Sequence, residues 1–358
     1  MARNTLARID RTALHHNLAR VRAMAPESRL MAVVKADAYG HRLDLCLSAL
    51  AEADLLAVAT IEEARAIRRL GCTTPVLLLE GVHDADDLAV AEELGLELTI
   101  HHQAQLLMLE ARGRSPAPRV WLKVNSGMNR LGVAPDQAKP FDRRLRALHG
   151  ISQVNLMTHF AQADSAQTGA TAAQVARFEA SIAGLSGERC LANSAALINY
   201  PDFHADWIRA GILLYGISPL PGQSGLELGL KPVMTLKSEL LAVNSVQAGD
   251  RVGYGGRFFA ERDMQIGVAA IGYGDGYPRN LNDGTPVLVN GKRCALAGRV
   301  SMDMITIDLS QSPDADIGDE VVLWGSDLPV EEVAQCADTI PYELVCRITR
   351  RVRYVSSP

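Results

Sequence analysis

Short apolar runs alternate with amphipathic stretches over the first two-thirds of the chain. The runs have the length of strands buried on both faces of a parallel sheet, and helical stretches follow Thr60 and Asp84, which are favourable N-cap residues. Such alternation predicts an α/β fold, most simply a TIM (β/α)8 barrel, although a doubly wound sheet fits the pattern too. The eight expected strands are 30–34, 55–59, 75–79, 97–100, 120–124, 154–158, 190–193 and 207–212.

From about residue 220 the pattern changes. Residues 219–225 hold two prolines and two glycines, which is typical of a linker, and strand-like runs separated by Gly, Asp and Asn turns follow. Asn290-Gly291 is a hairpin signal. We therefore expect a barrel over 1–225, with its extreme N-terminal strand 5–9 able to join the second domain, and a mostly β domain over 226–358. The expected elements of that domain are strands 233–246, 265–271, 286–289, 293–297, 304–309 and 320–324 and helix 328–337.

Composition narrows the class of protein. A chain of 358 residues, 48% hydrophobic and 22% charged, is long enough for two domains with ample core. The net charge of -5 and the absence of a basic run argue against a nucleic-acid partner. Six scattered cysteines without a CxxC pair favour reduced thiols over disulfides or a metal site. No signal peptide and no membrane-length apolar run are visible, so we expect a cytoplasmic protein without membrane contact.

Ionisable side chains collect at the expected strand ends. In a TIM barrel the carboxyl ends of the strands carry the chemistry. A lysine there either bends out to water or serves as a Schiff-base amine or general base, and an arginine inside an apolar strand needs a partner because a buried unpaired charge is costly. The residues at these ends are Lys35, Glu80, Lys123, His159, Asn193, Ser194 and Arg209.

Three turns near these ends offer anion-binding groups. Tyr39, Gly40 and His41 follow Lys35 closely and would suit a phosphate. Ser194 is either an N-cap or, with the N–H groups at a helix start, a phosphate ligand. Arg130 follows a glycine turn and is either a surface residue or a clamp for a carboxylate.

Other candidates are open to two interpretations. His159 is either a packed ring or a support for another polar group. Tyr254 stands between glycines, as an exposed hairpin residue or as a phenol presented to another surface. Residues 272–276 and 299–303 form similar polar turns.

Eight motifs together resemble the alanine racemase family, the bacterial pyridoxal 5'-phosphate (PLP) enzymes of fold-type III. They occur in the family's order at 35–41, 123–132, 158–160, 192–195, 209–216, 253–255, 272–276 and 299–303. The resemblance covers nearly the whole chain. It implies a PLP-binding barrel, a C-terminal β domain, a homodimer with active sites at the interface, and interconversion of L-alanine and D-alanine, either to supply D-alanine for peptidoglycan precursors or to degrade alanine.

The resemblance also implies roles for particular residues. Lys35 resembles the Schiff-base lysine and one catalytic base, and Tyr254 of the other subunit resembles the base for the opposite face of the substrate. Tyr39, Ser194 and the backbone of Gly211 and Ile212 resemble the phosphate ligands, and Arg209, held by His159, resembles the partner of the pyridine nitrogen. The remaining roles are substrate carboxylate binding by Arg130 and the Met302 N–H, support by Lys123 (carbamylated in some relatives, where it would hold Arg130) and Asp303, and a substrate corridor of Tyr273, Arg279 and Arg299.

The chain departs from the family pattern in two places. Asp37 and Arg42 replace the usual Asn and Gly, and we expect them to tune the turn. Arg350 is expected where many relatives carry a tyrosine that touches the phosphate, with Tyr354 further on, which leaves that contact and the preference for alanine over serine open. The alternatives are a serine or broad-range racemase, a non-catalytic single-barrel PLP carrier, and a basic amino-acid decarboxylase, which Arg209 disfavours.

Overall fold

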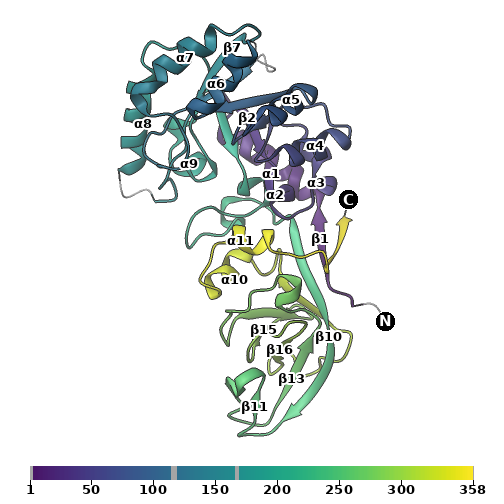
Figure 1. The fold of residues 1–358 in the computed structure, drawn as a ribbon. Coiled ribbons are helices and arrows are strands. Elements are labelled where there is room, and N and C mark those ends of the chain that lie inside the picture. Colours follow the sequence, from purple (N-terminus) through teal and green to yellow (C-terminus); the bar gives the residue numbers. More distant parts are fainter. Residues whose placement is uncertain (1–2, 114–118, 166–168, 358) are drawn as a thin grey trace.

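The computed structural model describes residues 3–113, 119–165 and 169–357, and its first domain is a closed parallel barrel (Figure 1). Eight strands pair in sequence order, and the last pairs with the first, so the predicted TIM barrel is confirmed. The expected seventh strand is the shortest, with two residues. The strands are β2 (Arg29–Val33), β3 (Leu55–Val58), β4 (Val76–Leu78), β5 (Leu96–Ile100), β6 (Arg119–Lys123), β7 (Gln153–Met157), β8 (Arg189–Cys190) and β9 (Trp207–Ala210).

Helices cover the outside of this barrel. Helix α4 begins with a capping box, in which Thr60 and Glu63 satisfy each other's backbone N–H groups, as the sequence pattern suggests. Asp84 likewise caps α5. The barrel helices are α1 (Arg11–Met24), α3 (Leu43–Leu50), α4 (Ile61–Arg69), α5 (Ala85–Glu93), α6 (Gln103–Arg112), α7 (Ala138–Arg146), α8 (Ala170–Ile182) and α9 (Ser194–Asn199).

The second domain is built on an eight-stranded sheet in the order β13-β16-β15-β14-β17-β10-β1-β18. Because β13 also pairs with β10, six of these strands close on themselves, and β1 and β18 extend the edge. Asn290 and Gly291, both at positive φ, form the predicted hairpin turn. The strands are β10 (Met234–Val246), β13 (Met264–Ala269), β14 (Pro286–Val289), β15 (Lys292–Leu296), β16 (Ile305–Asp308), β17 (Glu320–Trp324), β1 (Leu6–Asp10) and β18 (Arg353–Ser357).

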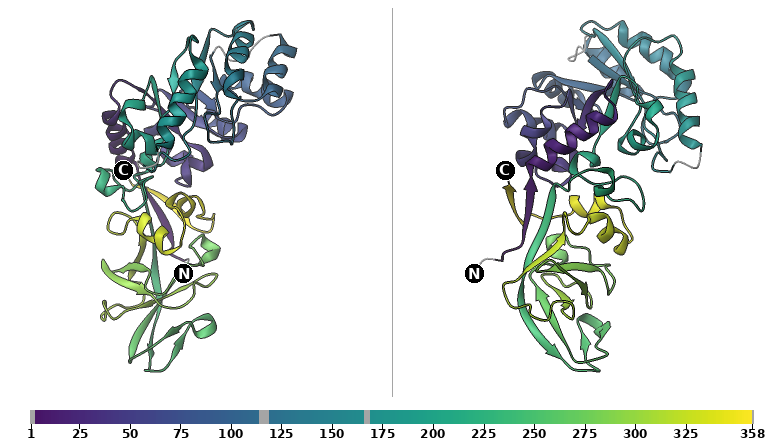
Figure 2. Two further views of the ribbon diagram at one scale, coloured as in Figure 1. Left: turned by 90° about the vertical axis from the view of Figure 1, so that its left-hand side faces the viewer. Right: turned by 180° about the vertical axis from the view of Figure 1, so that it is seen from behind.

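The two domains lie end to end and are joined by β10 and by the helices α10 (Val330–Cys336) and α11 (Pro341–Cys346) (Figure 2). Strand β1 pairs antiparallel with β10 and parallel with β18, so both chain ends lie in the second domain's sheet. One continuous apolar core runs from the barrel into the second domain. None of the helices within the described ranges is long and apolar enough to cross a membrane.

Candidate active site

A cavity of about 560 Å³ opens at the carboxyl ends of the barrel strands. Four cationic side chains and two carboxylates line it, which makes its charge balance positive. A site of this charge favours an anionic ligand. The predicted site residues that the structure brings together here are Lys35, Tyr39, Lys123, Arg130, His159, Ser194, Arg209, Gly211 and Ile212.

Lys35 begins an unusual left-handed turn directly after β2. The segment α2 (Lys35–Tyr39) has φ near 53° to 56° from Ala36 to Tyr39, although none of these residues is glycine. Side chains with a Cβ disfavour this conformation by about 1–2 kcal/mol per residue. The surrounding structure must therefore hold the turn, and strained backbone of this kind is concentrated at functional sites.

The turn is held from both sides. The Asp37 carboxylate accepts the N–H of Leu43 at 2.7 Å, which ties the turn to α3. His41 donates its Nδ1–H to the Tyr39 carbonyl at 2.9 Å and stacks on Tyr215. Burial lowers the pKa of His41 to about 4, so the ring is neutral. His41 supports the turn instead of lining the cavity, contrary to the phosphate-binding role considered for it.

Asp37 and Arg42, the two residues that depart from the family's first motif, lie in and directly after this turn. Arg42 adopts φ 68°, a conformation that glycine reaches more easily. Its guanidinium lies near Asp37 and Asp44 and over the ring of Tyr354. The Tyr354 hydroxyl donates to the Gly40 carbonyl at 2.8 Å. The end of the chain is thereby fastened to the turn that carries Lys35.

A set of hydroxyl and amide groups lies together where the Lys35 turn meets the end of β9. The N–H of Gly211 donates to Ser194 Oγ at 2.9 Å, and a Cβ added to Gly211 would lie 2.4 Å from the Tyr39 hydroxyl. Ile212 opens a 3-10 turn whose first amides have no partner inside the turn. Burial raises the pKa of Tyr39, so its phenol remains a donor. These donors suit a phosphate group.

The N-cap alternative for Ser194 is wrong. Asn193 is the N-cap of α9, and its side chain accepts the N–H of Ala196 at 3.0 Å. Ser194 is the first residue of the helix and is buried. Its hydroxyl is therefore directed to the Gly211 amide and the cavity, and not to the helix end.

Arg209 is buried and has only neutral partners among the described residues. It donates to the Cys190 sulfur at 3.0 Å, the Thr158 carbonyl at 3.1 Å and His159 Nδ1 at 2.8 Å. A guanidinium has five N–H donors, so two remain for a ligand. Burial, together with the charge of Arg209, lowers the pKa of His159 well below its usual value, which fits a neutral ring that accepts this hydrogen bond.

Lys123 lies at the end of β6 between other cations. Burial, followed by the charges of Arg209, Arg130 and Lys35, lowers the pKa of Lys123 to about 7. Half of the amine is therefore neutral near neutral pH. Arg130 lies at the exposed rim of the same cavity, after a turn in which Asn125 Oδ1 accepts the N–H groups of Gly127 and Asn129.

Tyr342 lines the cavity and was missed by the sequence interpretation. It is the second residue of α11, after Pro341, and its ring centroid lies 6.1 Å from that of Tyr39. Arg350 lies beyond α11 and is not among the residues lining the cavity, so the expectation that it stands at the cofactor is wrong. Proline followed by an acidic residue two positions later is a helix-start signal that could have pointed to Tyr342.

Six predicted residues lie away from this cavity, in the second domain, where Arg279 and Arg299 line a separate hollow. Tyr254 is 66% exposed, Met302 53% and Tyr273 39%. Asp303 forms an ion pair with Arg351. A single chain thus does not bring these residues to Lys35.

The fold and the cavity define a two-domain barrel enzyme with a cationic site. The family model for the alanine racemase N-terminal domain matches residues 9–219, and the one for the alanine racemase C-terminal domain matches 233–356. The chain belongs to the alanine racemase family, whose members are isomerases.

Full-length relatives support this assignment. An alanine racemase of Yersinia pestis is 49% identical over 345 residues, 96% of each chain. A biosynthetic alanine racemase of Escherichia coli is 47% identical over 346 residues, again 96% of each chain. The crystal structure of biosynthetic alanine racemase from Pseudomonas aeruginosa has a TM-score of 0.95, with 44% identity and complete coverage of both chains.

Proposed function

We propose that this chain is a PLP-dependent racemase that interconverts L-alanine and D-alanine by a two-base mechanism. The observation that carries the proposal is that Lys35, Arg209 and the Tyr39–Ser194–Gly211 donors line one cationic cavity. The presence of the C-terminal domain does not support a single-barrel carrier.

The residues present fit PLP. Lys35 Nζ would bind its aldehyde carbon, and the Tyr39 and Ser194 hydroxyls with the Gly211 and Ile212 amides would hold its phosphate. When bound, PLP supplies an electron-withdrawing ring that acidifies the α-hydrogen of alanine. Arg209 would donate an N–H to the ring nitrogen. Because a guanidinium does not release a proton, Arg209 keeps that nitrogen unprotonated, which favours return of the proton to the α-carbon.

Racemisation requires proton transfer on both faces of the α-carbon. The Lys35 amine takes or returns the proton on one face once the substrate amine has replaced it. The Tyr254 phenol, from the second subunit of a homodimer, serves the other face. This division explains why Tyr254 is exposed in the single chain.

The substrate carboxylate would be held by Arg130 and by the Met302 N–H of the second subunit. Lys123, with its pKa lowered to about 7, supplies a neutral amine that can add CO2 to give a carbamate and a proton. The negatively charged carbamate would form an ion pair with Arg130, whereas the protonated Lys123 amine repels Arg130. Tyr342 narrows the cavity from the side of α11, and Tyr273, Arg279 and Arg299 would line the corridor for substrate.

The test is α-proton exchange of L- and D-alanine in D2O with purified, PLP-loaded protein, followed by chiral analysis. The unaltered protein is expected to exchange and invert both enantiomers. Tyr254→Phe should slow proton removal from one enantiomer by about 10²–10⁴-fold while Lys35 still exchanges the other. Serine serves as the comparison substrate. Inversion of serine but not alanine would overturn the alanine assignment, and equal slowing of both enantiomers would overturn the two-base assignment.

A further inference from the structure

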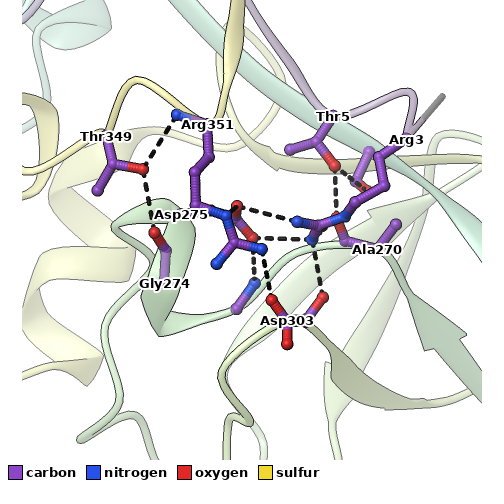
Figure 3. A network of polar contacts seen from close by, with 10 residues as sticks. Arg3, Thr5, Ala270, Gly274, Asp275, Asp303, Thr349 and Arg351 are labelled. Carbon is purple, nitrogen blue, oxygen red and sulfur yellow. Dashed lines mark hydrogen bonds and ion pairs between the residues drawn. The ribbon is translucent and has the colours of Figure 1, made fainter.

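Two aspartates and two arginines form a compact cluster, which Figure 3 shows. The Asp275 side chain is 1% exposed. Its two carboxylate oxygens accept hydrogen bonds from Arg3 at 3.1 and 2.8 Å, and one of them forms an ion pair with Arg351 at 3.3 Å. Arg351 also pairs with Asp303, and Arg3 donates to the Asp303 carbonyl at 2.8 Å. We call these four residues the Asp275 cluster.

The cluster joins two turns to each other. The N–H of Tyr273 donates to the Ser301 carbonyl at 3.0 Å, and that of Gly274 donates to the Met302 carbonyl at 2.9 Å. The approach is close enough that a Cβ on Gly272 would lie 2.3 Å from the Ser301 oxygen. Turn 272–276 and turn 301–303 therefore move as one unit, and Asp275 is the buried charge at its centre.

Asp275 also fixes the turn that contains it. Its carboxylate accepts the N–H of Gly272 at 2.9 Å, and its carbonyl accepts the N–H of Thr349 at 3.0 Å. The Thr349 hydroxyl donates to the Gly274 carbonyl at 3.0 Å. The turn is thus held on one side by the chain's first residues and on the other by the segment that follows α11.

The side chains that this unit carries are partly open to solvent, although the guanidinium of Arg279 lies over the Tyr273 ring. Tyr273 and Met302 project from it and are 39% and 53% exposed, while Asp275 beneath them is buried. A rigid, charge-anchored base under exposed side chains is the arrangement expected of groups that must be presented at a fixed position.

We propose that Asp275 is a positioning residue for the racemase reaction in the second subunit. Through Arg3 and Arg351 it sets where the Met302 N–H and the Tyr273 side chain stand. This inference rests on the proposed function, because it places these two groups in the neighbouring active site. Asp275 itself touches neither substrate nor cofactor.

The experiment uses mixed dimers made by co-expression of two differently tagged chains. One chain of the dimer carries Lys35→Ala, and the other keeps Lys35. Only one site of such a dimer is competent: it takes Lys35 from the unaltered chain and the second-domain turns from the Lys35→Ala chain. Asp275→Asn is placed either on the Lys35→Ala chain (trans) or on the other chain (cis). Asn keeps the size of the side chain and removes the charge that holds both arginines.

In trans, Asp275→Asn is expected to lower kcat/KM for alanine by about 10- to 100-fold, mostly through KM, since misplacement of a positioning group by about 1 Å has effects of this size. In cis the loss should stay within about twofold, and the visible absorption of bound PLP should be unchanged in both arrangements. Activity of the cis dimer also shows that the substituted chain folds.

The matched control is Asp319→Asn, because the Asp319 carboxylate also holds a turn of the second domain, through Asn290 and the N–H of Asp316, away from the Asp275 cluster. Asp319→Asn should leave kcat/KM for alanine unchanged in both the cis and the trans dimers. Equal losses in cis and trans would indicate an effect through α11 or on general stability and would overturn the inference. If the mixed dimer without Asp275→Asn does not racemise alanine, the proposed function fails and the inference falls with it.

Discussion

The barrel mouth and the outer turns of the second domain supply the proposed site in different ways. At the barrel mouth, Lys35 lines the same cavity as Arg209 and Ser194, which are held there by hydrogen bonds within the chain. In the second domain, Tyr254, Tyr273 and Met302 are exposed on turns whose backbone is fixed. The barrel residues lie together in one cavity of a single chain. The second-domain residues lie on fixed turns but do not line that cavity in their own chain. This difference fits the proposal that the site is divided between two copies of the chain.

Complementation of two inactive variants tests this division most severely. Lys35→Ala and Tyr254→Phe homodimers should each lose about 10²–10⁴-fold or more in racemisation. Mixed dimers contain one site with both defects and one site with neither. With random pairing in a symmetric dimer, about a quarter of the unaltered activity should return. Assays of the separate and refolded mixed proteins measure this, and a mixture no more active than its parents would refute a divided site.

Substitution of Lys123 tests the electrostatics of the barrel mouth without involving the second domain. Its pKa is lowered from 10.5 to about 7 in the folded protein, so folding disfavours its protonated form. The resulting destabilisation is complete below about pH 7, declines as pH rises, and vanishes above the unfolded value near 10.5. Lys123→Met should therefore stabilise the PLP-free protein by about 1–3 kcal/mol near pH 6 and by less near pH 9.

Urea unfolding of the PLP-free protein at the two pH values measures this difference. The control is Lys139→Met on α7, because Lys139 is exposed. Its substitution should shift stability little and without pH dependence. The interpretation of Lys123 is wrong if its variant parallels the unaltered protein at both pH values.

Tyr354→Phe tests how firmly the second domain holds the Lys35 turn. It removes the hydrogen bond to the Gly40 carbonyl, and a loss of about 0.5–1.5 kcal/mol in the free energy of unfolding is expected. Affinity for PLP should fall as well, because the turn carries Lys35. Tyr200→Phe, which removes a similar bond to the Ser165 carbonyl, is the control and should leave PLP affinity unchanged. Both quantities follow from unfolding curves and PLP titrations.

Ala36→Gly has the smallest expected effect. The substitution relieves about 1–2 kcal/mol of left-handed backbone strain in the folded state. It also gives the unfolded chain more conformational entropy, which lowers the stability by about 0.4–1 kcal/mol. The net result should be a stabilisation of about 0.5–1 kcal/mol, read from thermal or urea unfolding. The same change in the right-handed helix α6, Ala111→Gly, should destabilise instead. A loss of stability at Ala36 would show that the turn is not strained.

Much of the fold could be predicted because its signals are local. Each barrel strand is a short apolar run, and Thr60 and Asp84 mark helix starts independently of the rest of the chain. Lys35 and Arg209 could be singled out because a charge within apolar surroundings is unusual wherever the strand lies. These signals survive without knowledge of distant contacts.

The features that were missed depend on distant contacts. Nothing in residues 36–39 favours a left-handed turn, which is imposed by α3, His41 and Tyr354. Tyr342 lies on a helix of six residues, too short for a periodic pattern to reveal. Ser194 and Asn193 are equally good N-caps by composition, and the choice between them is made by the Gly211 amide, which follows β9. The placement of Tyr254, Met302 and Tyr273 at a second subunit came from the family resemblance and stays a prediction, because local pattern does not describe a second chain.

The pairing of β1 with β18 has a consequence for biosynthesis. Leu6 lies opposite Arg353, so β1 is synthesised long before the strand that pairs with its outer edge. Since Tyr354 on β18 also fastens the Lys35 turn, a chain made only as far as α11 lacks both the edge of the sheet and the hydrogen bond to Gly40. Order around Lys35 is therefore coupled to the synthesis of β18.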